Sequence, residues 1–216
     1  VRKGTVLMKI LNLFCGIGGN RKLWGDDHDV TAVEWDENIA TIYGDLFPND
    51  NLIVGDAHEF LRQHHDEFDF IWSSPPCQTH SSFRYNIGVR FRGVEPKFPD
   101  MRLYEEIVFL KYHSDALWLV ENVVPYYEPL IPATRIGRHL YWSNFDLPDL
   151  PHLVDNIRGN QIPDLEKLHG YDLSAYKLPN KRQVLRNVVS PEVGEMILQR
   201  VSNCYMNERF NSNEFV

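Results

Sequence analysis

The sequence predicts an α/β fold, in which a mostly parallel sheet carries helices on both faces. In the first half of the 216-residue chain, short apolar runs alternate with helical stretches, as in βαβ units. A glycine-rich turn follows the first apolar run, and several later runs end in acidic residues. Because open α/β sheets bind ligands at the carboxyl ends of their strands, the sequence predicts a ligand site at that edge.

The individual elements follow from the same periodicity. Six apolar runs are predicted to be strands: 9–15, 29–35, 51–56, 68–74, 115–123 and 139–145. Four stretches suit helices: 37–47, 57–68, 101–114 and a last one that begins at Pro191. Asp36 and Ser190 precede two of these helices and are typical N-cap residues. Residues 146–180 hold four prolines and weak periodicity, which predicts a small irregular subdomain.

The composition of the chain bears on its expected cellular compartment and on its expected binding partners. Three cysteines without a signal-peptide pattern favour a reducing cytoplasm, and no apolar run is long enough to span a bilayer. The natural start is expected at Met8, just before the first strand. Without a Cys-x-x-Cys pair, no metal is expected. The net charge of −8 weakly disfavours nucleic acid, yet residues 79–102 hold five basic and two acidic side chains.

The glycine-rich turn suits a nucleoside ligand. Gly16, Gly18 and Gly19 lie where the first strand turns into a helix, so a ligand can approach bare backbone. The turn matches neither the complete dinucleotide motif nor a P-loop, and a purely structural tight turn remains an alternative. Glu34 and Trp35 end the second strand, where a carboxylate can bind ribose hydroxyls and an indole can stack on adenine.

Two further features concern the same ligand. Asp56 ends the third strand and could meet the adenine amino group or the ribose edge. Apart from Arg21 and Lys22 in the following helix, the loop offers no basic side chain at a phosphate position. A nucleoside without phosphates therefore fits this arrangement.

A cysteine and a carboxylate follow two neighbouring strands. Cys77 lies behind Pro75 and Pro76, which end the fourth strand at its carboxyl edge. It is either a small buried hydrophobe or a nucleophile, for which it needs thiolate character. Glu121 and Asn122 end the fifth strand, where they either cap a loop or place a carboxyl group that donates a proton near a desolvated ligand.

These motifs, in this order, resemble those of the DNA (cytosine-5) methyltransferases. The resemblance covers residues 9–123 and returns at 182–193. It implies a Rossmann-like class I sheet that uses S-adenosylmethionine (SAM), and a catalytic domain built from residues 1–145 and 181–205. Residues 146–180 are then a small target-recognition region, and 206–216 are expected to be a flexible tail.

The resemblance also assigns roles to residues. Cys77 is implied as the nucleophile that adds to C6 of a flipped cytosine, with Glu121 as its acidic partner. Because the family's Gln-x-Arg-x-Arg element is missing here, Arg138 is our choice for a contact to the base or to Glu121. The implied SAM contacts are Phe14, Gly16, Gly18, Gly19, Glu34, Trp35, Asp56, Ala57, Pro76, Leu103, Asn187, Val188 and Val189. The implied DNA contacts are Gln78, Ser81, Arg84, Arg90 and Arg92.

Double-stranded DNA is therefore the expected partner, in a bacterial or phage-infected cytoplasm or, in a eukaryote, the nucleus. The recognition region is short and holds six acidic against four basic residues, counting Lys181 just beyond it, so a partner subunit or a dimer could assist recognition. Two alternatives stay open: an RNA (cytosine-5) methyltransferase, and a catalytically impaired accessory subunit that binds SAM or DNA. Exocyclic-amino methyltransferases are disfavoured, since they carry Pro-Pro-Tyr where this chain has Pro-Pro-Cys77.

Overall fold

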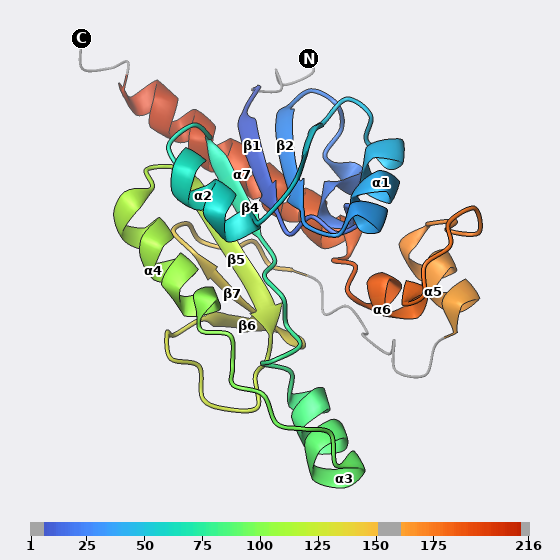
Figure 1. Ribbon diagram of the computed structural model, residues 1–216. Helices are drawn as coiled ribbons and strands as arrows, with labels where there is room; N and C mark the ends of the chain where they lie inside the picture. Colours follow the sequence, from blue (N-terminus) through green and yellow to red (C-terminus); the bar gives the residue numbers. More distant parts are fainter. Residues whose placement is uncertain (1–6, 151–160, 213–216) are drawn as a thin grey trace.

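A seven-stranded sheet forms the centre of the computed structural model, which describes residues 7–150 and 161–212 (Figure 1). The strand order is β3-β2-β1-β4-β5-β7-β6. The strands are β1 (Lys9–Leu13), β2 (Asp29–Glu34), β3 (Asn51–Val54), β4 (Phe70–Ser73), β5 (Leu117–Val123), β6 (Thr134–Ile136) and β7 (His139–Ser143). The first five are parallel, whereas β7 runs antiparallel to both β5 and β6. The order reverses between β1 and β4, which is the point where such sheets bind ligands.

Helices cover both faces of the sheet. These are α1 (Glu37–Leu46), α2 (Ala57–His64), α4 (Arg102–His113) and α7 (Pro191–Ser212). On one face, Ile197 and Val201 of α7 pack in a buried cluster with Ile10 and Trp72. On the other face, α2 and α4 pack in a second cluster around Leu11, Ile71 and Val120. The sequence therefore predicted the α/β class, the parallel core and the helices on both faces correctly.

Residues 161–180 are more ordered than the sequence indicated, and the prediction of an irregular subdomain was wrong for α5 (Ile162–His169). This helix begins with a capping box, in which the Gln161 backbone N–H donates to Asp164 Oδ2 at 3.0 Å. Pro163 lies in its first turn, where the missing N–H is tolerated. Residues 151–160 of the predicted subdomain lie outside the described residues.

The segment around α5 and α6 (Lys181–Arg186) packs on α1 and on the glycine-rich loop. Leu165, Leu173 and Leu185 share a buried cluster with Ile17 and with Ile42 of α1. Figure 1 shows α5 and α6 together on the side of the molecule that carries α1. The recognition region predicted from the sequence thus contributes directly to the core beneath the glycine-rich loop.

The C-terminal end also differs from expectation. Helix α7 continues to Ser212, so residues 206–212 are helical where a flexible tail was expected; 213–216 lie outside the described residues. The short helices η2 (Arg84–Val89) and α3 (Arg90–Arg92) were likewise not predicted, whereas η1 (Asn20–Leu23) is the short helix that was expected after the glycine-rich turn. Across residues 7–150 and 161–212, no helix has the length and apolarity needed to cross a membrane.

Candidate active site

The glycine-rich loop between β1 and η1 combines tight packing with one open face. A Cβ on Gly18 would lie 2.2 Å from the Phe47 ring, and one on Gly19 would lie 2.4 Å from the Val189 carbonyl oxygen. A Cβ on Gly16 would meet no described atom within 4 Å. Packing therefore requires glycine at two positions, while the third faces open space that a ligand could use. Val189 belongs to the segment 182–193, which the family resemblance predicts to line the site. Its contact with Gly19 brings that segment against this loop.

The Glu34 carboxylate is buried at the end of β2 and holds the loop in place. Its Oε2 accepts a hydrogen bond from Gly16 N at 3.0 Å, and its Oε1 accepts from Trp35 N and Asp36 N at 2.9 and 3.0 Å. Burial raises the pKa of Glu34, and the three backbone hydrogen bonds oppose this. Oε2 retains one lone pair for a hydroxyl donor. The neighbouring Trp35 is 80% exposed, so its ring is available for stacking.

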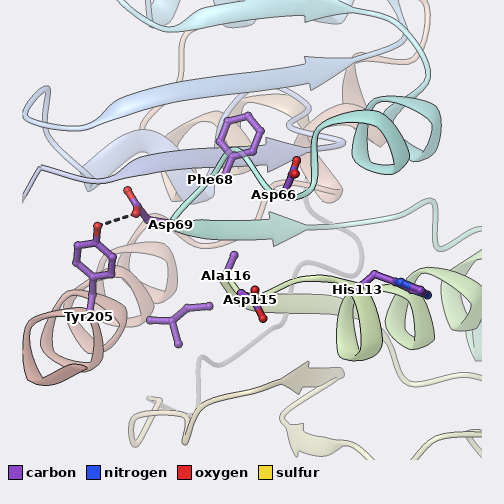
Figure 2. A pocket seen from close by; sticks show the side chains of 8 residues that line it. Asp66, Phe68, Asp69, His113, Asp115, Ala116 and Tyr205 are labelled. Atoms are coloured by element: carbon purple, nitrogen blue, oxygen red, sulfur yellow. Dashed lines mark hydrogen bonds between the residues drawn. The ribbon is translucent and has the colours of Figure 1, made fainter. Parts of the chain in front are cut away.

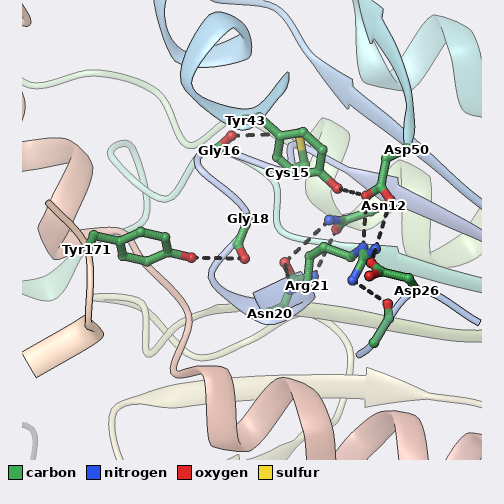
Figure 3. A network of polar contacts seen from close by, with 11 residues as sticks. Asn12, Cys15, Gly16, Gly18, Asn20, Arg21, Asp26, Tyr43, Asp50 and Tyr171 are labelled. Atoms are coloured by element: carbon green, nitrogen blue, oxygen red, sulfur yellow. Dashed lines mark hydrogen bonds and ion pairs between the residues drawn. The ribbon is translucent and has the colours of Figure 1, made fainter. Parts of the chain in front are cut away.

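The two basic side chains behind the loop, Arg21 and Lys22, are engaged in internal contacts, and Figure 3 shows those of Arg21. Arg21 is 2% exposed and forms a bidentate pair with Asp50, with two N···O distances of 2.8 Å. Tyr43 donates to the same carboxylate at 2.7 Å. The Lys22 ammonium donates to the carbonyls of His169 and Gly170 at the end of α5. Neither cation is therefore placed to bind a phosphate, which agrees with a ligand that has none.

The loop also receives support from the segment after α5. The Tyr171 hydroxyl donates to the Gly18 carbonyl at 3.1 Å, and Figure 3 shows this side chain reaching toward the loop. Nearby, Tyr176 donates to Asp45 of α1 at 2.9 Å. The shape of the glycine loop thus depends on residues far away in the sequence.

Cys77 follows β4 at the carboxyl edge and is half-buried. Its carbonyl accepts from His80 N at 3.1 Å and from Ser81 N at 3.0 Å, so a tight turn begins at this residue. The Asn122 side-chain amide donates to the Pro75 carbonyl at 2.9 Å. This hydrogen bond ties the loop that holds Cys77 to the end of β5.

A second set of contacts joins the chain after Cys77 to the chain after β5. Ser82 Oγ donates to the Val124 carbonyl at 3.2 Å, and Tyr126 N donates to the His80 carbonyl at 3.1 Å. The His80 ring nitrogen Nδ1 lies 2.5 Å from the Tyr127 hydroxyl. The loop of Cys77 and the strand end that carries Glu121 are therefore held together as one unit.

Cys77, Glu121 and Arg138 interact electrostatically. Burial raises the pKa of Glu121 to about 7, against the opposing effects of a Ser74 hydrogen bond and the Arg138 charge. Burial, and then the Glu121 charge, raise the pKa of Cys77 to about 11, while Arg138 opposes this. At neutral pH, Cys77 is therefore a thiol and Glu121 is about half protonated. The structure places Arg138 at the turn before β7, and its backbone carbonyl accepts from Val124 N at 2.9 Å.

The other residues predicted to contact SAM differ in their burial. Ala57, Leu103 and Val188 are buried in the core, whereas Asp56, Pro76 and Asn187 are exposed. Asp56 caps α2, with its Oδ1 accepting from His58 N at 2.9 Å. Sequence reasoning missed Ser74, whose hydroxyl accepts from Trp72 Nε1 at 2.9 Å and hydrogen-bonds Glu121. Its position directly before Pro75 was the available signal.

The segment after Cys77 extends away from the sheet, and we call residues 83–98 the basic lobe. Figure 1 shows α3 at its far end. Arg90 and Arg92 are exposed, as are Phe91 (80%) and Phe98 (95%). The other three predicted DNA contacts are not all exposed. Gln78 is exposed at the base of the lobe. Arg84 is half-buried; its side chain donates to the Glu95 carbonyl, and its backbone N–H donates to Ser81 Oγ.

A pocket of about 200 Å³ lies at the opposite edge of the sheet, before β4 and β5 (Figure 2). Asp66, Asp69 and Asp115 line it, and Tyr205 of α7 donates to Asp69 at 2.6 Å. It is separate from the cluster around Cys77. In residues 7–150 and 161–212, this pocket included, no group of three His, Cys, Asp or Glu side chains could hold a metal ion.

The strand order with an antiparallel β7 and the ligand edge next to β1 define a class I SAM-dependent methyltransferase fold. Residues 8–94 match the family model of the C-5 cytosine-specific DNA methylases, which confirms the resemblance seen in the sequence. The match includes the glycine-rich loop, Glu34 and Cys77, and it ends before Glu121. No curated protein sequence matches the chain.

Several solved structures are similar over part of the chain. The putative methyltransferase yhhF from Escherichia coli is 19% identical, with 62% of this chain and 72% of that chain covered and a TM-score of 0.43. A putative methylase from Haemophilus influenzae is 18% identical, with 66% and 82% covered and a TM-score of 0.45. A DNMT2 variant from Spodoptera frugiperda is 26% identical, with 53% and 35% covered and a TM-score of 0.37.

Proposed function

We propose that the protein is a DNA (cytosine-5) methyltransferase, which moves the methyl group of SAM to C5 of a flipped cytosine through a covalent bond between Cys77 and C6. One observation carries this proposal. At the carboxyl edge, beside a nucleoside-type loop, a cysteine lies close enough to a buried carboxyl group that the charge of Glu121 raises the cysteine's pKa. A methyltransferase that acts on an exocyclic amino group does not need a cysteine next to a buried carboxyl group.

The residues around the glycine loop suit SAM. The cofactor supplies an electrophilic methyl group on its sulfonium. Gly16 offers open space next to bare backbone, Glu34 Oε2 can accept from a ribose hydroxyl, and the exposed Trp35 can stack on adenine. Arg21 pairs with Asp50 and Lys22 donates to the Gly170 carbonyl, so neither side chain is available for a phosphate. This favours a nucleoside ligand over a nucleotide. The cofactor contacts implied by the family resemblance therefore become our proposal for the binding site.

Glu34→Gln is expected to weaken binding of the product S-adenosylhomocysteine (SAH) by about 10–100-fold. An amide has a single oxygen, so it cannot accept all three backbone hydrogen bonds and a ribose hydroxyl. Calorimetric titration measures the effect. Glu37→Gln, an exposed change in the first turn of α1, is the control and should bind SAH normally. Unchanged affinity in a folded Glu34→Gln protein would remove Glu34 from the site.

The chemistry requires both an electron-rich sulfur and an acid. The Cys77 thiol first loses its proton, and the thiolate then forms a bond to C6 of cytosine. Glu121 in its protonated form donates to N3 and stabilises the charge that develops there; its pKa of about 7 keeps enough of this form at neutral pH. The electron pair of the C5–C6 double bond moves to C5, which takes the methyl group from the sulfonium and leaves SAH. A base then removes the C5 proton, the double bond re-forms, the sulfur leaves C6 as a thiolate, and N3 returns its proton to Glu121.

The basic lobe is our candidate for the nucleic-acid contact. Cytosine C5 and C6 cannot be reached within a stacked duplex, so the base has to be flipped, which costs about a few kcal/mol. Arg90 and Arg92 are exposed for phosphate contacts, and Phe91 between them is available to stack on a base. Because the lobe begins directly after the Cys77 turn, a strand bound to it would pass near the nucleophile.

Arg92→Ala and Arg90→Ala should each weaken DNA binding at all sequences and reduce the slope of log K against log salt by about 1. Fluorescence anisotropy at several salt concentrations measures both effects. Arg62→Ala is the matched control, since this exposed arginine on α2 pairs with Glu59 and lies outside the lobe. If the control reduces the salt slope as much as the lobe variants, the lobe is not the contact surface.

Transfer of tritiated methyl groups to duplex DNA, mapped by bisulfite sequencing, tests the proposed function as a whole. We expect label at C5 of cytosine in DNA and none with Cys77→Ala. Label on adenine, or label on DNA that persists in Cys77→Ala, would contradict the mechanism. Label on RNA alone would show that the substrate is RNA and not DNA. Bound SAH without transfer to either polymer would indicate an accessory subunit.

A further inference from the structure

A buried ion pair joins the first turn of α2 to the first half of α4, beneath the proposed cofactor site. His58 Nδ1 lies 2.9 Å from Glu106 Oε2, and the two side chains are 18% and 0% exposed. Both carboxyl oxygens of Glu106 are buried, and neither makes a hydrogen bond with a residue that the structure describes. A carboxylate in this position is unfavourable unless it is paired, so His58 is the group that compensates its burial.

The pair adjoins several of the proposed cofactor contacts. The His58 ring packs edge-on against Phe14, with ring centroids 5.0 Å apart and an interplanar angle of 67°. The His58 backbone N–H donates to Asp56 Oδ1 at 2.9 Å. Leu103 lies one turn before Glu106 on α4 and is 3% exposed. The ion pair therefore connects the three elements that bring these contacts together.

Phe14 has a particular need for such support. Its φ of +54° lies in the left-handed region, where a non-glycine residue is strained unless its surroundings hold it. The edge-to-face contact with His58 acts on the ring of this residue. Since Phe14 begins the glycine loop, a change in its orientation would move the backbone that a ligand approaches.

We propose that His58 and Glu106 form a positioning pair, which holds Phe14 and the first turns of α2 and α4 in the geometry that binds the adenosyl part of SAM. The inference rests on the proposed cofactor site and adds two residues to it. Neither side chain belongs to the Cys77 and Glu121 cluster. The pair should therefore affect binding of the cofactor and not the chemical step.

The test compares His58→Ala, His58→Asn and Glu106→Gln, with calorimetric titration of SAH and steady-state kinetics on the same preparations. His58→Ala should weaken SAH binding by at least about tenfold and raise KM for SAM similarly, with kcat within about twofold of wild type. His58→Asn should recover much of the affinity, because its amide offers Glu106 an N–H donor. Glu106→Gln keeps the shape but loses the charge, and it should weaken binding at least about threefold.

His64→Ala is the matched control. It removes another His–Glu pair, in which His64 at the end of α2 lies 2.7 Å from the exposed Glu67 in the following turn, and the variant should bind SAH as wild type does. Loss of thermal stability in the His58 and Glu106 variants with unchanged SAH affinity would overturn the inference, because the pair would then be only structural. If His58→Ala does not fold, wild-type affinity in Glu106→Gln would overturn it equally. A wild-type protein that binds SAH without methylating DNA would contradict the proposed substrate alone, and the SAH titrations would still decide the role of the pair.

Discussion

Cys77→Ala is expected to lower methyl transfer to cytosine by at least about 10³-fold, while SAH binding and thermal stability stay close to those of the wild type. C5 of cytosine is a poor nucleophile until the sulfur has added to C6, so the loss concerns the chemical step alone. Cys77 is half-buried, and its backbone carbonyl, which alanine retains, accepts hydrogen bonds from His80 N and Ser81 N. Single-turnover methylation together with SAH titration separates chemistry from binding.

Cys204→Ala provides the control for this variant. Cys204 is also half-buried, but it lies on α7 next to the core cluster of the opposite face. Its replacement should leave both methylation and SAH binding unchanged. Equal losses of activity in the two variants would indicate a general effect of removing a thiol, which contradicts a nucleophilic role for Cys77.

Glu121→Gln is expected to reduce methyl transfer by about 10²–10³-fold near pH 6.5, because the amide cannot transfer a proton to N3. The deficit should depend on pH. Glu121 has a pKa of about 7, so the wild type loses the acid form as pH rises above 7, whereas the glutamine does not titrate. The ratio of wild-type to variant activity should therefore fall by about tenfold per pH unit above 7. A constant ratio from pH 6 to pH 9 would exclude Glu121 as the acid.

The same substitution has an expected effect on stability. The folded-state pKa of Glu121 lies above its ordinary value of 4.5, so burial of the neutral acid stabilises the fold below pH 4.5, and this contribution is lost as pH rises through about 7. Glu121→Gln should accordingly gain in unfolding free energy relative to wild type over that interval, by up to about 3 kcal/mol. Urea unfolding at pH 5 and pH 8 measures the gain, with the exposed change Glu128→Gln as the control.

Strand ends were the part of the site that the sequence could predict. A parallel strand brings its last residues to one edge, so Glu34, Cys77 and Glu121 could be placed near one another from their positions after apolar runs alone. Arg138 was predicted as a contact to the base or to Glu121 because the family's Gln-x-Arg-x-Arg element is missing from this chain. The structure brings its charge near both Glu121 and Cys77. Its role in catalysis stays a prediction.

Interactions between distant segments could not be predicted in the same way. Nothing near Arg21 in the sequence indicates that Asp50 neutralises it, and nothing near Gly18 indicates that Tyr171 supports its carbonyl. Helix α5 was missed for a different reason. Proline density was interpreted as irregular structure, although Pro163 lies in a first turn, where the local capping box favours a helix.

Covalent trapping with duplex DNA that contains 5-fluorocytosine tests the central claim most directly. Fluorine at C5 cannot be removed as a proton is, so the enzyme cannot complete the step that releases the sulfur from C6. With SAM present, we predict an adduct that survives denaturation, carries one transferred methyl group and maps by peptide mass spectrometry to Cys77. No adduct on a protein that binds SAH, or an adduct at another residue, would contradict the account.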